Sequence, residues 1–157
     1  MAFAIYDLAV GAGRLGIAPL PRDRDDVAFI CDWGACLVIS MTTRQEMAEV
    51  GMADLGLTLV QRGLQWDHVA VEDFGEPSGT SQQAWSRAQA HALVVLQGGG
   101  HVLIHCKGGC GRSGMAALRV VILAGEAPDV ALIRLRHVRP CAVETDAQMA
   151  WAQNPSQ

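Results

Sequence analysis

The hydrophobic positions of the chain form short runs with strand character, separated by longer segments with helical spacing. These runs occupy residues 3–10, 15–18, 36–40, 66–71 and 101–105. Strands that alternate with helices along a chain are typical of an α/β sandwich with a largely parallel central sheet. We therefore expect an α/β fold in which helices flank such a sheet.

Two of the helical segments open with a capping-box pattern, in which a Thr is followed three residues later by Glu or Gln. Thr43 with Glu46 opens one segment, and Thr80 with Gln83 opens the other. The second segment also has apolar residues at helical spacing, which predicts one buried face. Its members are Trp85, Ala88, Ala92 and Val95.

Three further helices are predicted towards the C-terminus. Residues 113–124 are almost wholly apolar, which indicates a central, buried helix. Residues 128–138 begin with a proline, which suits the first turn of a helix. A last helix is expected from Thr145 to about Gln153.

Length, composition and charge limit the class of protein. The chain has 157 residues, half of them apolar, which is enough for one sizeable core but not for two, so we expect one domain over residues 1–157. The formal net charge is −4 and the basic residues are scattered, which argues against nucleic acid as the main partner. The N-terminus lacks a basic region and reaches Asp7 before any long apolar stretch, which argues against a signal peptide or membrane segment. We expect a cytoplasmic monomer.

The cysteines point to thiol chemistry rather than to a structural framework. Their number is five, which is odd, and the chain shows no secretion signal, so a disulfide scaffold is not expected. At least one cysteine is therefore a candidate reactive thiol. Lys107, the only lysine of the chain, lies next to Cys106 and is a weak hint towards that cysteine.

Residues 101–115 read as a strand, a glycine-rich loop and the start of a helix. Gly108, Gly109 and Gly111 allow the backbone to curl tightly with its N–H groups pointing inward. Together with the positive end of the following helix, these groups would form an anion cradle. Cys106 lies at the rim of this cradle, which favours a thiolate, so Cys106 is the candidate nucleophile.

Arg112 and Ser113 complete the candidate anion site. The planar guanidinium of Arg112 can hold two phosphate oxygens, and Ser113 can donate a hydrogen bond to the sulfur. The alternative is an ordinary buried cysteine followed by a glycine turn. We favour the anion site, because a cysteine, five residues and an arginine between a strand and a helix is a specific pattern. We expect His105 to support the loop through a backbone hydrogen bond.

Residues 105–114 resemble the signature of the protein tyrosine phosphatase superfamily, in particular its compact dual-specificity branch and the cyclin-dependent-kinase-associated members with their bacterial relatives. Residues 71–77 resemble the acid loop of that branch and residues 139–148 its C-terminal turn, so the resemblance covers about residues 14–152. It implies the cysteine phosphatase fold, a phosphocysteine intermediate on Cys106, Asp73 as general acid, and no metal or cofactor. It also implies phosphate binding by Lys107, Gly108, Gly109, Cys110, Gly111 and Arg112.

The predicted sheet also limits which carboxylates could be the general acid. Sites in open α/β sheets lie at the carboxyl ends of the strands, so the loop 72–79 should overhang the cradle. Its carboxylates are Glu72, Asp73 and Glu76, whereas Asp67 begins its strand and falls at the wrong edge. The residues alone leave all three open, and the resemblance favours Asp73.

Gln148 allows two interpretations. It follows Thr145 by three residues, as in a capping box, whereas the resemblance implies that it places the hydrolytic water. Cys110 and Cys141 both depart from the family pattern, which has a glycine at the position of Cys141. As a hypothesis, Cys110 forms a reversible disulfide with oxidised Cys106; the alternative partners of Cys106 are Cys31, Cys36 and Cys141.

Three other patterns are given no catalytic role. Residues 11–16 satisfy a dinucleotide-binding fingerprint, but Pro19 and Pro21 follow where a helix is required. His101 and His105 lie four residues apart on a strand, roughly 13 Å, which is too far to share a zinc ion. A basic cluster is attributed to a solvated helix end, or to a wider positive approach to the pocket. It consists of Arg134, Arg136, His137 and Arg139.

These features together predict a protein phosphatase, tyrosine-specific or of dual specificity. A phosphoinositide or an RNA 5′ phosphate is the alternative substrate. A rhodanese-type sulfurtransferase also has a cysteine in an anion loop but needs no overhanging acid, and a binding module would keep the pocket without turnover. The small arsenate reductases and low-molecular-weight phosphatases are excluded, because their loop follows the first strand.

Overall fold

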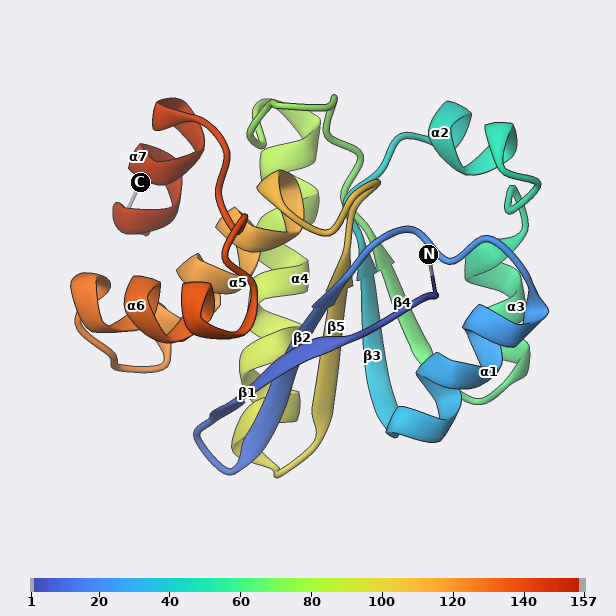
Figure 1. Ribbon diagram of the computed structural model, residues 1–157, viewed down its shortest axis with the longest axis horizontal. Helices are drawn as coiled ribbons and strands as arrows, with labels where there is room; N and C mark the ends of the chain where they lie inside the picture. The colour runs from blue at the N-terminus through green and yellow to red at the C-terminus, as the bar shows by residue number, and fades with distance from the viewer. Residues whose placement is uncertain (1, 156–157) are drawn as a thin grey trace.

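A five-stranded sheet in the order β1-β2-β5-β3-β4 forms the centre of the fold (Figure 1). The computed structural model describes residues 2–155. The edge strand β1 (Tyr6–Val10) is antiparallel to β2 (Gly13–Ala18). The other pairings are parallel and join β2 to β5 (His101–His105), β5 to β3 (Ala35–Ser40) and β3 to β4 (Gln65–His68). The largely parallel sheet predicted from the sequence is confirmed.

Three helices lie on one side of the sheet, at the right in Figure 1. They are α1 (Arg24–Trp33), the short α2 (Arg44–Glu49) and α3 (Leu55–Gln61). Their buried residues pack with β3 and β5 in one hydrophobic cluster, which includes Val27, Ile30, Val38, Met47, Leu55, Leu59 and Leu103. The sequence indicated helical spacing between the strands but gave α1 and α3 no defined bounds.

Four helices cover the other face (Figure 1). They are α4 (Thr80–Gln97), α5 (Gly111–Leu123), α6 (Pro128–Val138) and α7 (Asp146–Gln153). Every residue from Gly111 to Val121 is buried, because α5 lies among the sheet, α4, α6 and α7. The central buried helix predicted here is confirmed, and it begins two residues earlier than expected.

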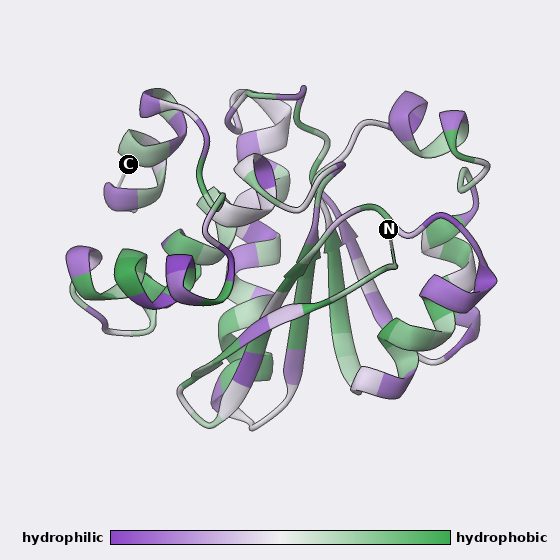
Figure 2. Cartoon of the chain, viewed as in Figure 1, coloured by the Kyte–Doolittle hydropathy of each residue, from purple (hydrophilic) through white to green (hydrophobic). Residues whose placement is uncertain are grey.

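The central strands are apolar on both faces, which explains why they read as unbroken hydrophobic runs (Figure 2). In β5, Val102 and Ile104 belong to the cluster with α4 and α5, whereas Leu103 belongs to the cluster with α1 and α3. The predicted strand 66–71 is longer than the observed one, because β4 ends at His68. Its continuation still follows β3, since the N–H of Val69 donates to the carbonyl of Ser40 at 2.9 Å.

The two predicted capping boxes have different outcomes. Thr43 and Glu46 form a complete box at the start of α2. The box at Thr80 is wrong, because Gly79 is the N-cap of α4, with φ at +54°, and no side chain caps that helix. The predicted bounds of α6 are confirmed.

The fold bears on the glycine fingerprint of residues 11–16 and on the question of membrane-spanning helices. Gly13 and Gly16 lie in β2 and not at the start of a helix, so the rejection of a dinucleotide-binding fingerprint is confirmed. Over residues 2–155, none of the helices combines the length and the apolar character needed to cross a membrane.

Candidate active site

The candidate nucleophile lies at the carboxyl edge of the sheet. Cys106 directly follows β5 and is only 3 % exposed. Its Sγ lies 3.2 Å from the Oγ of Ser113, which is buried in the first turn of α5. The structure thus brings the two residues into hydrogen-bond contact.

The loop after Cys106 is held tightly against the end of β2. Gly109 has φ at +74°, and a Cβ at this position would lie 2.7 Å from the backbone of Ala18 and Pro19. No side chain fits there, which explains the glycine. The N–H of Leu20 donates to the carbonyl of Lys107 at 3.1 Å, which fixes the loop from the same side.

His105 supports the loop from beneath, as expected. Its Nδ1 lies 3.2 Å from the carbonyl of Cys106, and its Nε2 lies 2.5 Å from the Oγ of Ser40. Burial lowers the pKa of His105 to about 4, so the ring is neutral at pH 7. A carbonyl only accepts, so Nδ1 carries the proton and Nε2 accepts one from Ser40. Ser40 in turn accepts from the indole N–H of Trp66 at 2.8 Å.

Arg112 is held in one orientation by acceptors on two other segments. It is 1 % exposed, and its Nη1 and Nη2 donate to the two carboxylate oxygens of Glu46 at 2.7 and 2.8 Å. Nη1 also donates to the carbonyl of Val71 at 2.8 Å. The buried Nε has no hydrogen-bond partner among the described residues. The edge of the guanidinium that contains Nε is therefore the one left for an anion.

Glu46 is a site residue that the sequence did not identify. Its Oε1 accepts from the backbone N–H of Thr43, as the capping box requires, and also from the hydroxyl of Thr43 and from Arg112. The hydrogen bonds from Arg112 lower the pKa of Glu46 to about 2. The capping box alone accounts for a glutamate here, so the local pattern gave no sign of a contact 66 residues away.

Asp73 is the loop carboxylate that reaches the site. Its Oδ1 lies 3.3 Å from Nη2 of Arg112 and accepts the N–H of Phe74 at 3.0 Å. Its side chain is 47 % exposed. Glu72 and Glu76 are not among the residues that line the cavity above Cys106.

That cavity has a volume of about 300 Å³. It is lined by Asp73, Phe74, Cys106, Lys107, Gly108, Cys110, Gly111 and Glu144. Glu144 was not singled out from the sequence, because nothing in its spacing distinguishes it from a solvated carboxylate. Its Oε1 would lie 2.2 Å from a Cβ on Gly111, so a second carboxylate lies close against the loop.

Gln148 has the capping role that the sequence allowed. Its side-chain oxygen accepts the N–H groups of Glu144 and Thr145 at 2.9 and 3.2 Å, and Thr145 caps α7 in return. Its Nε2 donates to the carbonyl of Gly75 at 3.1 Å, which ties α7 to the loop that carries Asp73. Gln148 is buried and is not among the residues that line the cavity.

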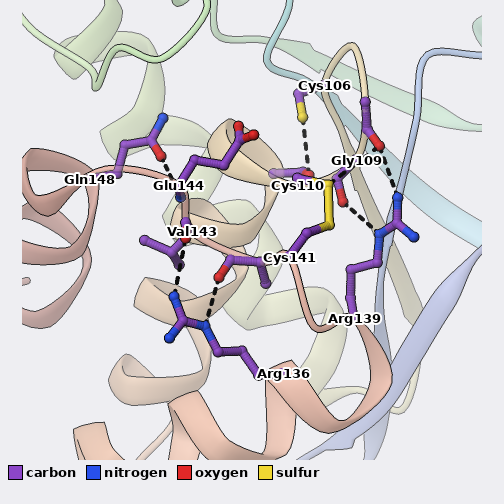
Figure 3. The surroundings of a disulfide bond; sticks show 12 residues. Cys106, Gly109, Cys110, Arg136, Arg139, Cys141, Val143, Glu144 and Gln148 are labelled. Carbon is purple, nitrogen blue, oxygen red and sulfur yellow. Dashed lines mark hydrogen bonds between the residues drawn. A yellow bond between two sulfur atoms is a disulfide. The ribbon is translucent and has the colours of Figure 1, made fainter.

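Cys110 is joined to Cys141 by a disulfide (Figure 3). The hypothesis that Cys110 pairs with Cys106 is therefore wrong in this structure, where Cys106 is a free thiol. The odd number of cysteines argued correctly against full pairing but said nothing about a single bridge. The bridge joins the anion loop to the turn after α6.

Arg139 contacts the same loop from outside (Figure 3). Its Nε and Nη2 donate to the carbonyls of Gly109 and Gly108 at 3.1 and 3.0 Å, and its guanidinium lies 4.1 Å above the ring of Tyr6. In a planar trans peptide the N–H points opposite to the carbonyl. Because Arg139 binds these two carbonyls, the following N–H groups, those of Gly109 and Cys110, point away from Arg139.

The basic cluster is therefore not simply a solvated helix end. Arg136 donates to the carbonyls of Ala142 and Val143 at 2.9 and 3.1 Å and orders the turn (Figure 3). Arg134 forms an ion pair with Glu126 and donates to the carbonyl of Ala9. The backbone acceptors of these arginines come from residues distant in sequence or from an irregular turn, which helical spacing does not reveal.

The histidines near the loop have separate partners. His101 lies with its Nδ1 3.0 Å from the carbonyl of Trp33, whereas His105 contacts Ser40 and Cys106. Within residues 2–155, no cluster of three His, Cys, Asp or Glu side chains is arranged to hold a metal ion.

Comparison with known proteins adds a family match. A family model described as "Swiss Army Knife protein, DSP-PTPase phosphatase domain" matches residues 9–152. A comparison with curated proteins finds no match.

Several solved structures share the fold. Kinase associated phosphatase, with its catalytic cysteine substituted by serine, has a TM-score of 0.84 at 22 % identity, over 98 % of this chain and 94 % of that one. Tk-PTP in its active form has a TM-score of 0.70 at 26 % identity, over 96 % and 95 %. PTPMT1 in complex with PI(5)P has a TM-score of 0.78 at 16 % identity, over 95 % and 93 %.

Proposed function

Because this chain belongs to the DSP-PTPase phosphatase family and is therefore a phosphoric monoester hydrolase, we propose that it dephosphorylates proteins through a covalent intermediate on Cys106. The specificity would be for tyrosine alone or dual. One observation supports the mechanism above others. The free thiol of Cys106, its hydrogen-bond partner Ser113 and the unpartnered Nε of Arg112 lie together where the loop meets α5.

In the first step, the thiolate of Cys106 attacks phosphorus. A sulfur–phosphorus bond forms while the bond from phosphorus to the leaving oxygen breaks, and Asp73 gives its proton to that oxygen. The products are a phosphocysteine, the dephosphorylated side chain and an ionised Asp73. The position of Asp73 in the lining of the cavity above Cys106 supports this role.

In the second step, water attacks the phosphorus of the phosphocysteine. The carboxylate of Asp73 takes a proton from this water, the phosphorus–sulfur bond breaks, and the thiolate is stabilised by the hydrogen bond from Ser113. We assign the placement of this water to Gln148. Glu144 is the alternative residue for this role, because it lines the cavity.

Phosphate would be held by the guanidinium edge of Arg112 that contains Nε and by the inward N–H groups of residues 107–111. Glu46 and the carbonyl of Val71 occupy three of the other four N–H groups of Arg112. The guanidinium is therefore oriented before substrate arrives, which strengthens electrostatic stabilisation of the transferring group.

A panel of phosphoesters assayed in EDTA tests this function. Phosphotyrosine and phosphothreonine peptides should be hydrolysed, and acid quenching should trap phosphate on the wild-type protein. Cys106→Ser should bind phosphate but not turn over, because a serine hydroxyl is barely ionised at neutral pH. Turnover by this variant at the wild-type rate would refute the covalent mechanism.

The same panel separates the competing functions. PTPMT1 is described in complex with a phosphoinositide, so a phosphoinositide is the second substrate candidate and belongs in the panel. Thiosulfate-to-cyanide transfer without phosphoester hydrolysis would indicate a sulfurtransferase. Phosphate binding without either reaction would indicate a binding module.

A further inference from the structure

A second hollow lies beside the phosphate cavity and is not used by the mechanism above. It has a volume of about 460 Å³ and shares Lys107 and Gly108 with the first cavity, so the two lie side by side. Its other walls come from the N-terminal segment and the start of β1, from the segment between β2 and α1, from α1, and from the C-caps of α2 and α6. They are formed by Ala2, Phe3, Ala4, Tyr6, Pro19, Leu20, Arg22, Asp26, Val50 and Arg139.

The charge of this hollow is positive. Three cations, Arg22, Lys107 and Arg139, face one carboxylate, that of Asp26. Asp26 already accepts the backbone N–H of Arg22 at 2.9 Å, and Arg139 is engaged with the loop and Tyr6. Arg22 and Lys107 are exposed and form no ion pair among the described residues. Two cationic groups are therefore available to an anionic ligand.

The rest of the wall is apolar and selects the kind of ligand. Phe3, Leu20 and Val50 present hydrocarbon, and few polar side chains are available to hydrogen-bond a polyhydroxylated ring. Against this apolar part of the wall, the hydroxyl groups of an inositol headgroup would lose water contacts that Arg22 and Lys107 could replace only in part. A hydrophobic side chain of a peptide would gain from the same wall.

From this geometry we propose that the second hollow is a specificity subsite for phosphopeptides that carry a large apolar residue and an acidic residue next to the phosphorylated one. The proposal rests on the proposed phosphatase function and adds the substrate class. The phosphorylated side chain occupies the cavity over Cys106, and the apolar neighbour lies against Leu20 and Val50. The acidic neighbour pairs with Arg22, while Lys107 lies between the two cavities.

The test is a peptide panel with nitrophenyl phosphate as the reference substrate, which has no flanking residues, and Arg22 does not line the cavity over Cys106. One phosphopeptide is varied at each position that flanks the phosphorylated residue. At each position Leu is compared with Gly, and Glu is compared with Lys. Leu should raise kcat/KM about tenfold over Gly at one position, as expected for an apolar side chain that enters a pocket. Glu should exceed Lys by about two- to fivefold, the range expected for an exposed ion pair.

Charge reversal identifies the residue responsible. Arg22→Glu should invert the preference so that the Lys peptide becomes the better substrate, with nitrophenyl phosphate turnover unchanged. Arg24→Glu is the matched control, because Arg24 is an exposed arginine on the same segment that does not line the hollow, and it should retain the wild-type preference. Equal melting temperatures of the two variants and the wild type establish that both are folded.

The outcomes separate this proposal from the function on which it rests. No hydrolysis of any phosphoester overturns the proposed function. Hydrolysis of nitrophenyl phosphate with equal kcat/KM for all peptides, or equal losses in Arg22→Glu and Arg24→Glu, overturns the subsite alone. The proposal that the ligand is a peptide is overturned if a phosphoinositide in detergent micelles has a kcat/KM at least tenfold higher than every peptide.

Discussion

The buried, neutral state of His105 has a measurable effect on the stability of the protein against acid. The imidazole is fully buried, which lowers its pKa from 6.5 to about 4, while in the unfolded chain it titrates normally. Between these two values the unfolded state binds more protons than the folded state. The free energy of unfolding therefore falls as the pH falls from 6.5 towards 4, and this contribution is fully present above 6.5.

The size of the effect follows from the two pKa values. Between pH 7 and pH 5.5, His105 alone should reduce the free energy of unfolding by about 1 kcal/mol, and the loss approaches about 3 kcal/mol below pH 4. His68 contributes in the same direction, since burial also lowers its pKa. The pH dependence of the wild-type free energy of unfolding therefore contains both contributions, and a variant is needed to isolate that of His105.

His105→Asn removes the titrating group and keeps a donor for the carbonyl of Cys106. Urea unfolding followed by tryptophan fluorescence at pH 7, 6 and 5.5 gives the free energy of unfolding for each protein. The wild-type advantage over the variant should shrink by about 1 kcal/mol from pH 7 to pH 5.5. Ser40→Ala is the comparison variant, because it removes the hydrogen bond that the neutral ring accepts but no titrating group, so it should lower the stability and keep a pH dependence of the same sign. Parallel curves for the wild type and His105→Asn would refute the buried neutral histidine.

The remaining predictions concern the site. Asp73→Asn should reduce phosphopeptide hydrolysis by about 10²–10⁴-fold but nitrophenyl phosphate hydrolysis far less, because nitrophenol leaves without a proton; equal losses for both substrates would show that another group is the acid. Arg139→Gln should weaken competitive inhibition by vanadate about tenfold as the loop carbonyls lose their donors, whereas Arg134→Gln should not, as inhibition constants would show. Ser113→Ala should give a burst of nitrophenol followed by a slow steady state in stopped-flow records, and a uniform loss in both phases would contradict its role in thiolate release. Glu144→Gln and Gln148→Ala should differ in that same steady-state phase, and the residue that places the water is the one whose variant slows it.

The loop and the central helix were predictable because their signals are local. Glycines, a strand before them and an apolar segment after them define the strand, the loop and α5 within 23 residues of sequence. The placement of Cys106 beside Ser113 follows from the same local geometry. The carboxyl-edge rule for parallel strands then brought the loop with Asp73 to the correct side of the sheet.

The supporting contacts were not predictable because they join distant segments. Glu46 already has a local explanation as part of a capping box, and its second role depends on the position of α2 relative to α5. The contacts of Arg139 depend on the path of the chain after α6. The pairing of Cys110 with Cys141 likewise needs coordinates, since cysteine spacing does not define connectivity.

The bridge between Cys110 and Cys141 makes the choice of assay buffer part of the experiment. It encloses α5 and α6 in one covalent ring, since the two cysteines lie 31 residues apart. Dithiothreitol is the usual means of keeping a nucleophilic thiol such as Cys106 reduced, and the same reagent opens this ring. Preparations with and without reductant are therefore two chemical forms of the enzyme, one with its anion loop covalently tethered and one in which His105, Arg139 and backbone contacts hold it without that tether.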